Sequence, residues 1–352
     1  MSFLDRILDP PSYGYEKNGA LYVPTHREIF SEFFARLNIF RTRKNWLALI
    51  AWVTTLGFGI PLALFFTHHF SWWLLLAGFI YSMVILGTHG TIWYHRYSTH
   101  RAFQFKNAFF RELCRNLVVK TISEEAYVVS HHVHHAKVEQ PGDPYNAKAG
   151  WLYCFLADVN HQGIRRDLSP KDYSQLRKLV EHTGVHVNSY EQYQKWGSLC
   201  HPAWTVAHFL ANWAVWYGLF FLIGGHGLAL ALFGWSGVWA VGVRTFNYDG
   251  HGGGKDRRRD GVDFNMKDQS INQLWPGLIT GEWHNNHHLY PHGARAGFLS
   301  YQFDPAWHFI RGGSWLGAIS SYRDFKQEFM EQHYLPWAEK QKKAKAPVVV
   351  SG

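Results

Sequence analysis

Charge is scarce in this sequence, and two long stretches have none. Asp, Glu, Lys and Arg make up 17% of the 352 residues, against about 25% in typical soluble domains. No such residue occurs between Lys44 and Arg96, or between Lys195 and Arg244. Soluble cores rarely exclude every charge over runs of this length. The two stretches therefore disfavour the alternative of two buried core hairpins in a soluble protein.

Each charge-free stretch is long enough for two membrane-spanning helices and a turn, because one spanning helix needs roughly 20 apolar residues. The first stretch predicts helices over Trp46–Phe66 and Trp72–Tyr94, separated by the sequence THHFS. The second predicts helices over Ala203–Ile223 and Leu228–Thr245, separated by GGHG. Lipid offers no partners to unpaired backbone groups, so helices are the expected spanning form.

Basic residues predict the orientation. Neither expected turn contains any of the 35 Lys and Arg residues, and cytoplasmic segments carry the excess of such residues. We therefore expect an all-α integral membrane protein with four spans in two hairpins, both termini in the cytoplasm, and a helical cytoplasmic cap. We expect six segments along the chain. They are a cytoplasmic N-terminal segment (1–45), a first transmembrane hairpin (46–95), a cytoplasmic region (96–202), a second transmembrane hairpin (203–246), a second cytoplasmic region (247–335) and a disordered basic tail (336–352).

Cysteine is also scarce. Cys114, Cys154 and Cys200 are far apart and form no CxxC pair, so the sequence indicates neither a disulfide framework nor a zinc ribbon. The beginning of the chain is polar and lacks the apolar region of a cleavable signal peptide. The net charge of +9 suits an anionic lipid surface, and we expect no nucleic-acid partner.

Histidine, in contrast, is abundant and clustered in four motifs, WYHRYSTH, SHHVHH, NYDGH and GEWHNNHH. The first and third motifs lie at the expected cytoplasmic ends of the second and fourth helices, and the others lie in cytoplasmic segments. All four can therefore meet at one site just outside the membrane. The histidines that we expect to act together are His95, His100, His131, His134, His135, His251, His284, His287 and His288.

Spacing within the motifs supports convergence. The second and fourth motifs share the pattern H-x-x-H-H, which places three histidines on one face of a helix. Asn247 and His251 are four residues apart and also share a face. His95 and His100 are five residues apart, about 140° around a regular helix, so we expect the helix to end or bend between them.

Nine imidazoles on convergent faces predict a metal site, and they are too many for one ion. Imidazole suits zinc, copper, iron and nickel, whereas structural zinc sites take four ligands and typically include cysteine. The set fits two ions of moderate coordination number, and the residue types do not choose among the metals. A metal transporter is disfavoured because transporters need polar residues at mid-membrane depth, and the expected spans lack Asp and Glu.

The boxes H-x4-H at His95, H-x2-H-H at His131 and H-x2-H-H at His284 resemble those of integral-membrane fatty acid desaturases. DPYN after the second box and the pair Asn247-x3-His251 are similar to the acyl-CoA and Δ9-type branch, the stearoyl-CoA desaturase relatives. The resemblance covers roughly residues 46–301. GEWHNNHH is one residue shorter than the family's usual GEGFHNYHH and is similar to bacterial members.

The resemblance implies a non-haem diiron enzyme that uses O2 and two electrons to introduce a cis double bond, at Δ9, into a saturated long-chain acyl group. It implies two Fe2+ ions, with Asn247 holding a water on one of them. By motif, one iron takes His95, His100, His131, His134 and His287, and the other takes His135, His251, His284 and His288. The alternatives are a diiron fatty-acid hydroxylase or an oxidative decarboxylase on the same scaffold.

The same resemblance implies partners and a location. We expect the substrate to be an acyl-CoA or an acyl-lipid in the bilayer, and we expect the protein to lie in a bacterial inner membrane with its active site on the cytoplasmic side. No HPGG haem motif occurs, so we expect electrons from a separate ferredoxin, rubredoxin or cytochrome b5.

Weaker candidates accompany the boxes. Carboxylates near metal-ligating histidines can fix their tautomers, with helix capping as the alternative; the candidates are Asp143, Asp249 and Glu282. Basic residues can bind substrate headgroup phosphates, with positive-inside bias as the alternative; these are Arg165, Arg166, Lys255, Arg257 and Arg258. Three other histidines are expected to lie outside the site: His89 within a helix, His132 facing away and His292 in a loop.

Overall fold

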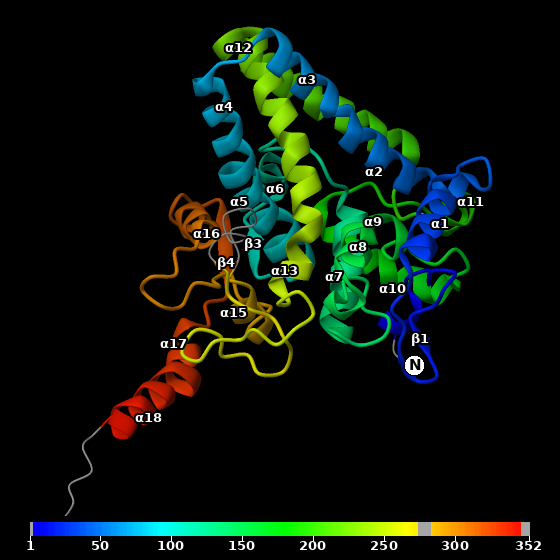
Figure 1. The fold of residues 1–352 in the computed structure, drawn as a ribbon. Coiled ribbons are helices and arrows are strands. Elements are labelled where there is room, and N and C mark those ends of the chain that lie inside the picture. The colour runs from blue at the N-terminus through cyan, green and yellow to red at the C-terminus, as the bar shows by residue number, and fades with distance from the viewer. Residues whose placement is uncertain (1–2, 274–282, 346–352) are drawn as a thin grey trace, which may run out of the picture.

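The computed structural model describes residues 3–273 and 283–345, and these are mostly helical (Figure 1). A short antiparallel ladder near the N-terminus pairs Glu16 with Leu21. It is followed by an amphipathic helix that Thr25 and Glu28 begin with reciprocal capping hydrogen bonds. The N-terminal elements are η1 (Leu4–Arg6), β1 (Glu16–Lys17), β2 (Ala20–Leu21), α1 (His26–Leu37) and η2 (Arg43–Asn45).

An apolar helical hairpin follows, with its turn at the expected THHFS sequence. Its two helices, Arg43–His68 and Trp72–Thr99, are long and apolar enough to cross a membrane. Ser71 begins the second helix by accepting a hydrogen bond from the backbone N–H of Leu74 at 3.2 Å. The elements are α2 (Trp46–Gly57), α3 (Gly59–His68), α4 (Trp72–Phe79), η3 (Ile80–Leu86), α5 (Gly87–Gly90) and η4 (Thr91–Thr99).

The third apolar helical segment doubles back on itself. It comprises α12 (Pro202–Gly242), η7 (Val243–Thr245) and α13 (Phe246–Gly250). The rings of Phe220 and Phe233 lie 6.2 Å apart, whereas thirteen residues of straight helix extend about 20 Å. The reversal occurs at the expected GGHG sequence, where Gly225 has φ +68° and ψ −169°, a conformation that glycine adopts without strain. The returning half packs against α3 and α4 (Figure 1).

The hairpins pack closely inside and present apolar side chains outside. A Cβ at Gly234 would lie 2.6 Å from the Cα of Leu62, so the absence of a side chain lets α12 and α3 approach closely, as at membrane helix interfaces. On the outer surface, Trp73 is 81% exposed and Leu222 is 80% exposed. A large exposed apolar surface marks contact with a membrane or a partner. Among the described residues, three helices thus support membrane association.

The helices outside the hairpins gather at one end of the molecule (Figure 1). Their centre is α7, whose Val128, Val129 and Val133 are buried against Tyr173 and Leu176 of α10. The elements between the hairpins are β3 (Phe103–Phe105), α6 (Ala108–Arg115), α7 (Glu124–Lys137), η5 (Ala147–Ala149), α8 (Trp151–Phe155), α9 (Ala157–Asn160), α10 (Pro170–Val180), η6 (Glu181–Thr183) and α11 (Tyr190–Trp196).

The C-terminal part returns to the first hairpin through an antiparallel ladder in which Phe103 pairs with Tyr322. A buried ion pair, Arg96 with Asp304 at 3.0 Å, joins the same two regions. The C-terminal elements are α15 (His284–Leu289), α16 (Pro305–Trp315), β4 (Ile319–Tyr322), α17 (Lys326–Phe329), η8 (Met330–Tyr334) and α18 (Leu335–Lys345).

The expectation of a disordered tail from residue 336 is wrong as far as Lys345, because α18 extends to that residue. Lys, Gln, Glu and Ala favour helix, and one side of α18 has a partner. Trp337 donates to a carboxylate oxygen of Asp260 at 2.9 Å and packs edge-on against Phe264. The rest of the expected tail, residues 346–352, lies outside the described residues.

Candidate metal centre

The structure brings the nine expected histidines together in two groups. Within each group, the candidate ligand atoms lie within 4.8 Å of one another. The histidines come from four segments that are far apart in the sequence: η4 with the residue after it, α7, the residue after α13, and α15. The first group is His95, His100, His131, His135 and His287, and the second is His134, His251, His284 and His288.

The grouping corrects the expected partition by one exchange. We expected His134 in the first set and His135 in the second, and the structure has the reverse. On α7, His131 and His135 are related by i, i+4 and are about 40° apart around the helix, whereas His134 lies about 60° to the other side of His131. His135 therefore shares an ion position with His131, and His134 points toward the other group.

A π-helix brings the two histidines of the first motif together. We expected the helix to end or bend between His95 and His100, and the helix is indeed distorted there: η4 is a π-helix that ends at Thr99. The backbone N–H of His100 donates to the carbonyl of His95 at 3.1 Å, the i→i+5 bond that defines this helix type. The wider turn places the two rings 5.0 Å apart, centroid to centroid. Both histidines therefore reach the same group, His95 from within η4 and His100 from the residue that follows it.

The distances between ring nitrogens fit shared ions. The Nε2 atoms of His95 and His287 are 2.8 Å apart, and those of His251 and His284 are 3.1 Å apart. Two nitrogens bound at right angles to one ion, each at about 2.0–2.1 Å, would be about 3 Å apart. The spacing is therefore that of neighbouring ligands around an ion.

Unpartnered nitrogens give a second indication of the fit. The Nε2 atoms of His100, His134 and His288 are buried and have no hydrogen-bond partner among the described residues. Buried polar atoms nearly always have a partner, and a metal ion would supply it here. An all-imidazole donor set suits iron, zinc, copper or nickel. The residues present thus fit two such ions.

Burial favours the neutral form of six of the nine imidazoles, and ligation requires that form. Burial holds their pKa values well below the ordinary value, and the neighbouring histidines lower them further. This applies to His100, His131, His135, His284, His287 and His288.

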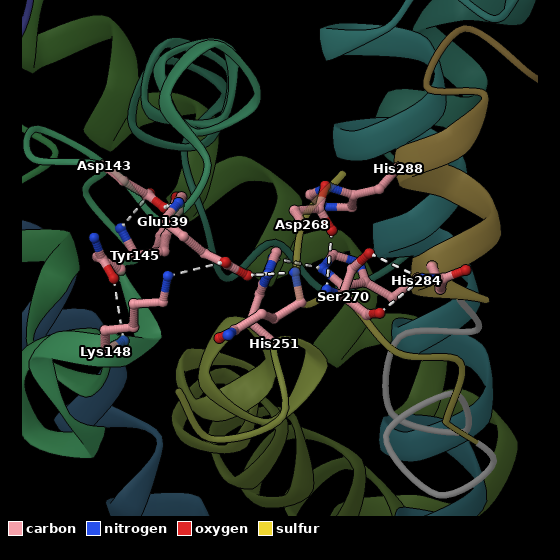
Figure 2. Close-up of polar contacts among 12 residues, drawn as sticks. Glu139, Asp143, Tyr145, Lys148, His251, Asp268, Ser270, His284 and His288 are labelled. Atoms are coloured by element: carbon pink, nitrogen blue, oxygen red, sulfur yellow. Dashed lines mark hydrogen bonds and ion pairs between the residues drawn. The ribbon is translucent and has the colours of Figure 1, made fainter. Parts of the chain in front are cut away.

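Carboxylates hydrogen-bond to the Nδ1 atoms of histidines in the second group (Figure 2). Nδ1 of His134 lies 2.8 Å from Oδ1 of Asp143, one of the three expected carboxylates. Asp143 is buried and also accepts the backbone N–H groups of Glu139 and Tyr145, each at 2.9 Å. A proton on Nδ1 leaves Nε2 of His134 free to bind a metal. Asp143 therefore fixes both the tautomer and the direction of this ligand.

Sequence reasoning missed two further carboxylates of the same kind. Nδ1 of His251 lies 3.1 Å from Oε1 of Glu139, and Nδ1 of His288 lies 3.1 Å from Oδ2 of Asp268 (Figure 2). Glu139 stands four residues after the second box, so its nearness in sequence was a usable signal. Asp268 lies in an irregular segment far from any box, and no pattern in the sequence indicates it.

The remaining candidates near the boxes differ in position. The carboxylate of Asp249 hydrogen-bonds to Thr245 rather than to a histidine of the site, and Glu282 lies outside the described residues. Asn247 precedes His251 by one turn, and its buried Oδ1 has no hydrogen-bond partner among the described residues. An unpaired buried acceptor of this kind can hold a water.

The three histidines expected outside the site have other surroundings. Nε2 of His89 lies 2.7 Å from the carbonyl oxygen of Cys114, so it is satisfied within the protein. His292 is exposed, and its Nδ1 lies 3.1 Å from the carbonyl oxygen of His100. Among the described residues, His132 joins neither group of ligand atoms.

A cavity lies beside the two histidine groups, with two tyrosine rings in its wall facing them. It lies between α2, α7, α9 and the two halves of the second hairpin, and part of it is open to solvent. Tyr127 and Tyr145 are in its wall, and their rings lie 5.2 Å from that of His131 and 5.4 Å from that of His134, respectively. Two tyrosine rings in the wall of this mostly apolar cavity therefore adjoin one histidine of each group, and none of the nine histidines is itself in the wall.

The five basic candidates do not form one cluster around this cavity. Arg166 lines it together with Lys44. Arg165 is paired with Asp167 at 2.8 Å. Arg258 donates to the carbonyl oxygen of Asp268 at 3.0 Å and so supports the segment that holds His288. Lys255 and Arg257 are exposed.

Comparisons with known proteins agree with this site. A family model described as fatty acid desaturase matches residues 70–313, which include all four motifs. An sn-1 stearoyl-lipid 9-desaturase of Anabaena variabilis is 27% identical over 270 residues, covering 73% of this chain and 88% of the relative. An sn-2 palmitoyl-lipid 9-desaturase of Nostoc sp. (strain 36) is 26% identical over 280 residues, covering 74% and 86%. An icosanoyl-CoA 5-desaturase of Limnanthes douglasii is 26% identical over 252 residues, covering 69% and 63%. The chain belongs to the fatty acid desaturase family, as a Δ9 desaturase-like member.

Proposed function

We propose that this protein is an oxygen-dependent desaturase that introduces a cis double bond at Δ9 into a saturated long-chain acyl group carried as an acyl-CoA or acyl-lipid. The observation that carries the proposal is the nearness of a mostly apolar cavity to two all-histidine groups, through Tyr127 and Tyr145 in its wall. The cavity suits an alkyl chain, and the histidines suit two iron ions.

The chemistry explains why such a site is needed. A saturated methylene has no acidic proton and no leaving group, so acid and base side chains cannot activate it. Bound iron, with O2 and two external electrons, supplies the oxidising power. One CH2–CH2 unit, O2, two electrons and two protons become one CH=CH unit and two waters. A separate donor of the ferredoxin, rubredoxin or cytochrome b5 type delivers the electrons.

The residues of the chain divide the remaining work. The nine histidines hold the ions without adding negative charge, so the metal charge stays high. Asp143, Glu139 and Asp268 hold Nδ1 of three ligands in the second group and keep their Nε2 atoms directed at the ion. Asn247 holds a water at the same group. The mostly apolar wall of the cavity holds the acyl chain beside the site.

We further propose that the chain crosses a bacterial inner membrane four times, with the active site and both termini in the cytoplasm. The segment Pro202–Gly250 has 49 residues, or about 73 Å of helix, more than twice the hydrocarbon thickness of about 30 Å. Its reversal at Gly224 and Gly225 makes two crossings of suitable length. Both hairpin tips lack Lys and Arg, which supports this orientation.

Expression in a host that lacks its own desaturase tests the proposed function. Mapping double bonds in total lipids by mass spectrometry should show Δ9 monounsaturated chains, and His134→Ala expressed at the same level should show none. Hydroxylated chains or terminal alkenes in place of monounsaturated chains would assign the protein to a related diiron hydroxylase or decarboxylase instead.

A further inference from the structure

A charged pair lies in the wall of the cavity. Arg244 of η7 and Asp158 of α9 both line it. Nη2 and Nε of Arg244 lie 2.9 Å and 3.1 Å from Oδ2 of Asp158, and the two side chains are 12% and 17% exposed. Arg244 belongs to an apolar segment long enough to cross a membrane. Ionisable residues in such segments are costly and mark functional positions.

The hydrogen bonds of Arg244 leave capacity for a ligand. Its guanidinium also donates to Thr55 Oγ1 at 3.2 Å and to the carbonyl of Ala240, and it stacks on Trp52. These contacts use four of the five N–H donors of an arginine. On the acceptor side, Asp158 Oδ1 is buried without a hydrogen-bond partner among the described residues. The pair is therefore held rigidly but is not fully satisfied.

The charge of the pair selects the kind of ligand. Asp158 neutralises Arg244, so the pair suits a neutral polar group better than a phosphate. Two cationic residues, Lys44 and Arg166, line another part of the cavity wall, where charged groups can bind. Lys44 donates to the carbonyl of Arg166 at 3.2 Å. Lys44 precedes Thr55 by eleven residues, about 16 Å along α2. In an acyl substrate, the neutral acceptor attached directly to the alkyl chain is the carbonyl of its ester or thioester.

We propose that Arg244, held by Asp158 and Thr55, binds the carbonyl oxygen of the acyl substrate and sets which carbons lie at the metal centre. This inference rests on the proposed desaturase function. Arg244 is then a positioning residue that determines where the double bond forms. The position is set by the distance from the carbonyl and does not depend on the distance from the methyl end of the chain.

Double-bond mapping with chains of different length tests the inference. Cells that express the wild type should be supplied with saturated chains of 16, 17 and 18 carbons. The double bond should keep one position counted from the carbonyl. In Arg244→Gln, the ratio of this isomer to its neighbours should fall about tenfold, equivalent to about 1.4 kcal/mol, because a hydrogen bond to a charged donor is lost.

Arg115→Gln is the matched control. Arg115 is 10% exposed and is paired with a buried Glu124, much as Arg244 is with Asp158, but among the described residues it does not line this cavity. Its loss should leave the double-bond position unchanged, whatever the yield. Should Arg244→Gln fail to accumulate, Thr55→Val removes one acceptor that holds the guanidinium, and the isomer ratio should fall about threefold.

The outcomes separate the two levels of the argument. A wild type that makes no monounsaturated chains would overturn the proposed function. A productive wild type would overturn only the Arg244 inference in any of three cases. The first is a double bond that stays at a fixed distance from the methyl end. The second is an accumulating Arg244→Gln, or in its place Thr55→Val, with an unchanged isomer ratio. The third is a spread in Arg115→Gln as large as in Arg244→Gln.

Discussion

Replacing Asp143 by Asn should loosen one ion of the pair while leaving the other in place. Oδ1 of Asp143 faces Nδ1 of His134 at 2.8 Å and the N–H of Tyr145 at 2.9 Å, and Oδ2 faces the N–H of Glu139 at 2.9 Å. All three neighbours are donors. An asparagine side chain has only one oxygen, so it can accept from the donors at one of the two carboxylate oxygen positions. Its NH2 group then occupies the other position and faces an N–H donor in a buried site.

The size of the effect follows from this geometry. Losing such a supporting partner typically costs about 10- to 100-fold in metal affinity, or about 1.4–2.8 kcal/mol. The stranded buried donor costs about 1–3 kcal/mol of folding free energy in addition. Because His134 belongs to the second group, the loss should fall on that ion. The first group contains neither His134 nor the other two histidines held by carboxylates.

Chelator titration of iron-loaded protein in detergent measures the effect. Wild type should release its two ions at similar chelator concentrations, whereas Asp143→Asn should release one ion at about 10- to 100-fold lower concentration. Asp249→Asn is the matched control, because that carboxylate bonds to Thr245. The reasoning is refuted if Asp143→Asn binds both ions as wild type does, or if Asp249→Asn loses one ion as readily.

Three further predictions concern the boxes, the pH dependence and the topology. His251→Ala should abolish desaturation in cells and Asn247→Ala should weaken it by about 10- to 100-fold, while His132→Ala keeps substantial activity; an abundant, metal-loaded but inactive His132→Ala would contradict the grouping. Burial, and then the charge of Arg101, lowers the pKa of His182 to about 4, below the 6.5 of an unfolded histidine. The neutral form of His182 stabilises the fold above about pH 6.5, and this contribution is lost as the pH falls toward 4. The Tm of His182→Gln should therefore fall less than the Tm of the wild type between pH 7 and pH 4.5. An equal fall in both proteins would rule out this contribution. Single cysteines at Ser71 and His226 should react with an impermeant thiol reagent from outside intact cells, since the three native cysteines are buried; labelling only after lysis would refute the proposed topology.

The sequence predicted the apolar hairpins and the convergence of the histidines because both depend on local patterns. The length of each charge-free stretch indicates membrane-spanning helices, and the GGHG sequence indicates a reversal between two of them. Neither indication depends on the fold of the rest of the chain. H-x-x-H-H spacing places three histidines on one face of any α-helix. The helical tail, in contrast, depends on Trp337 finding Asp260 and Phe264, which are distant in sequence and invisible to a local pattern.

The details of the site depend on tertiary contacts and were missed for that reason. The spacing of His95 and His100 indicated a distorted helix, but it could not indicate the π-helical form of that distortion, which depends on which carbonyl accepts each backbone N–H. The exchange of His134 and His135 follows from how α7 is rotated against its neighbours. Asp268 reaches His288 through an irregular segment, whose path no periodicity in the sequence specifies.

The central claim is that the nine histidines form one site for two iron ions. The most direct test is the iron content of protein purified without oxygen, reconstituted with Fe2+ and freed of loosely bound metal, together with its turnover under O2 and a reductant. About two ions per chain are predicted, because the histidines form two groups of ligand atoms, and turnover should fall as the content drops below two. Full turnover at about one ion per chain would contradict the claim.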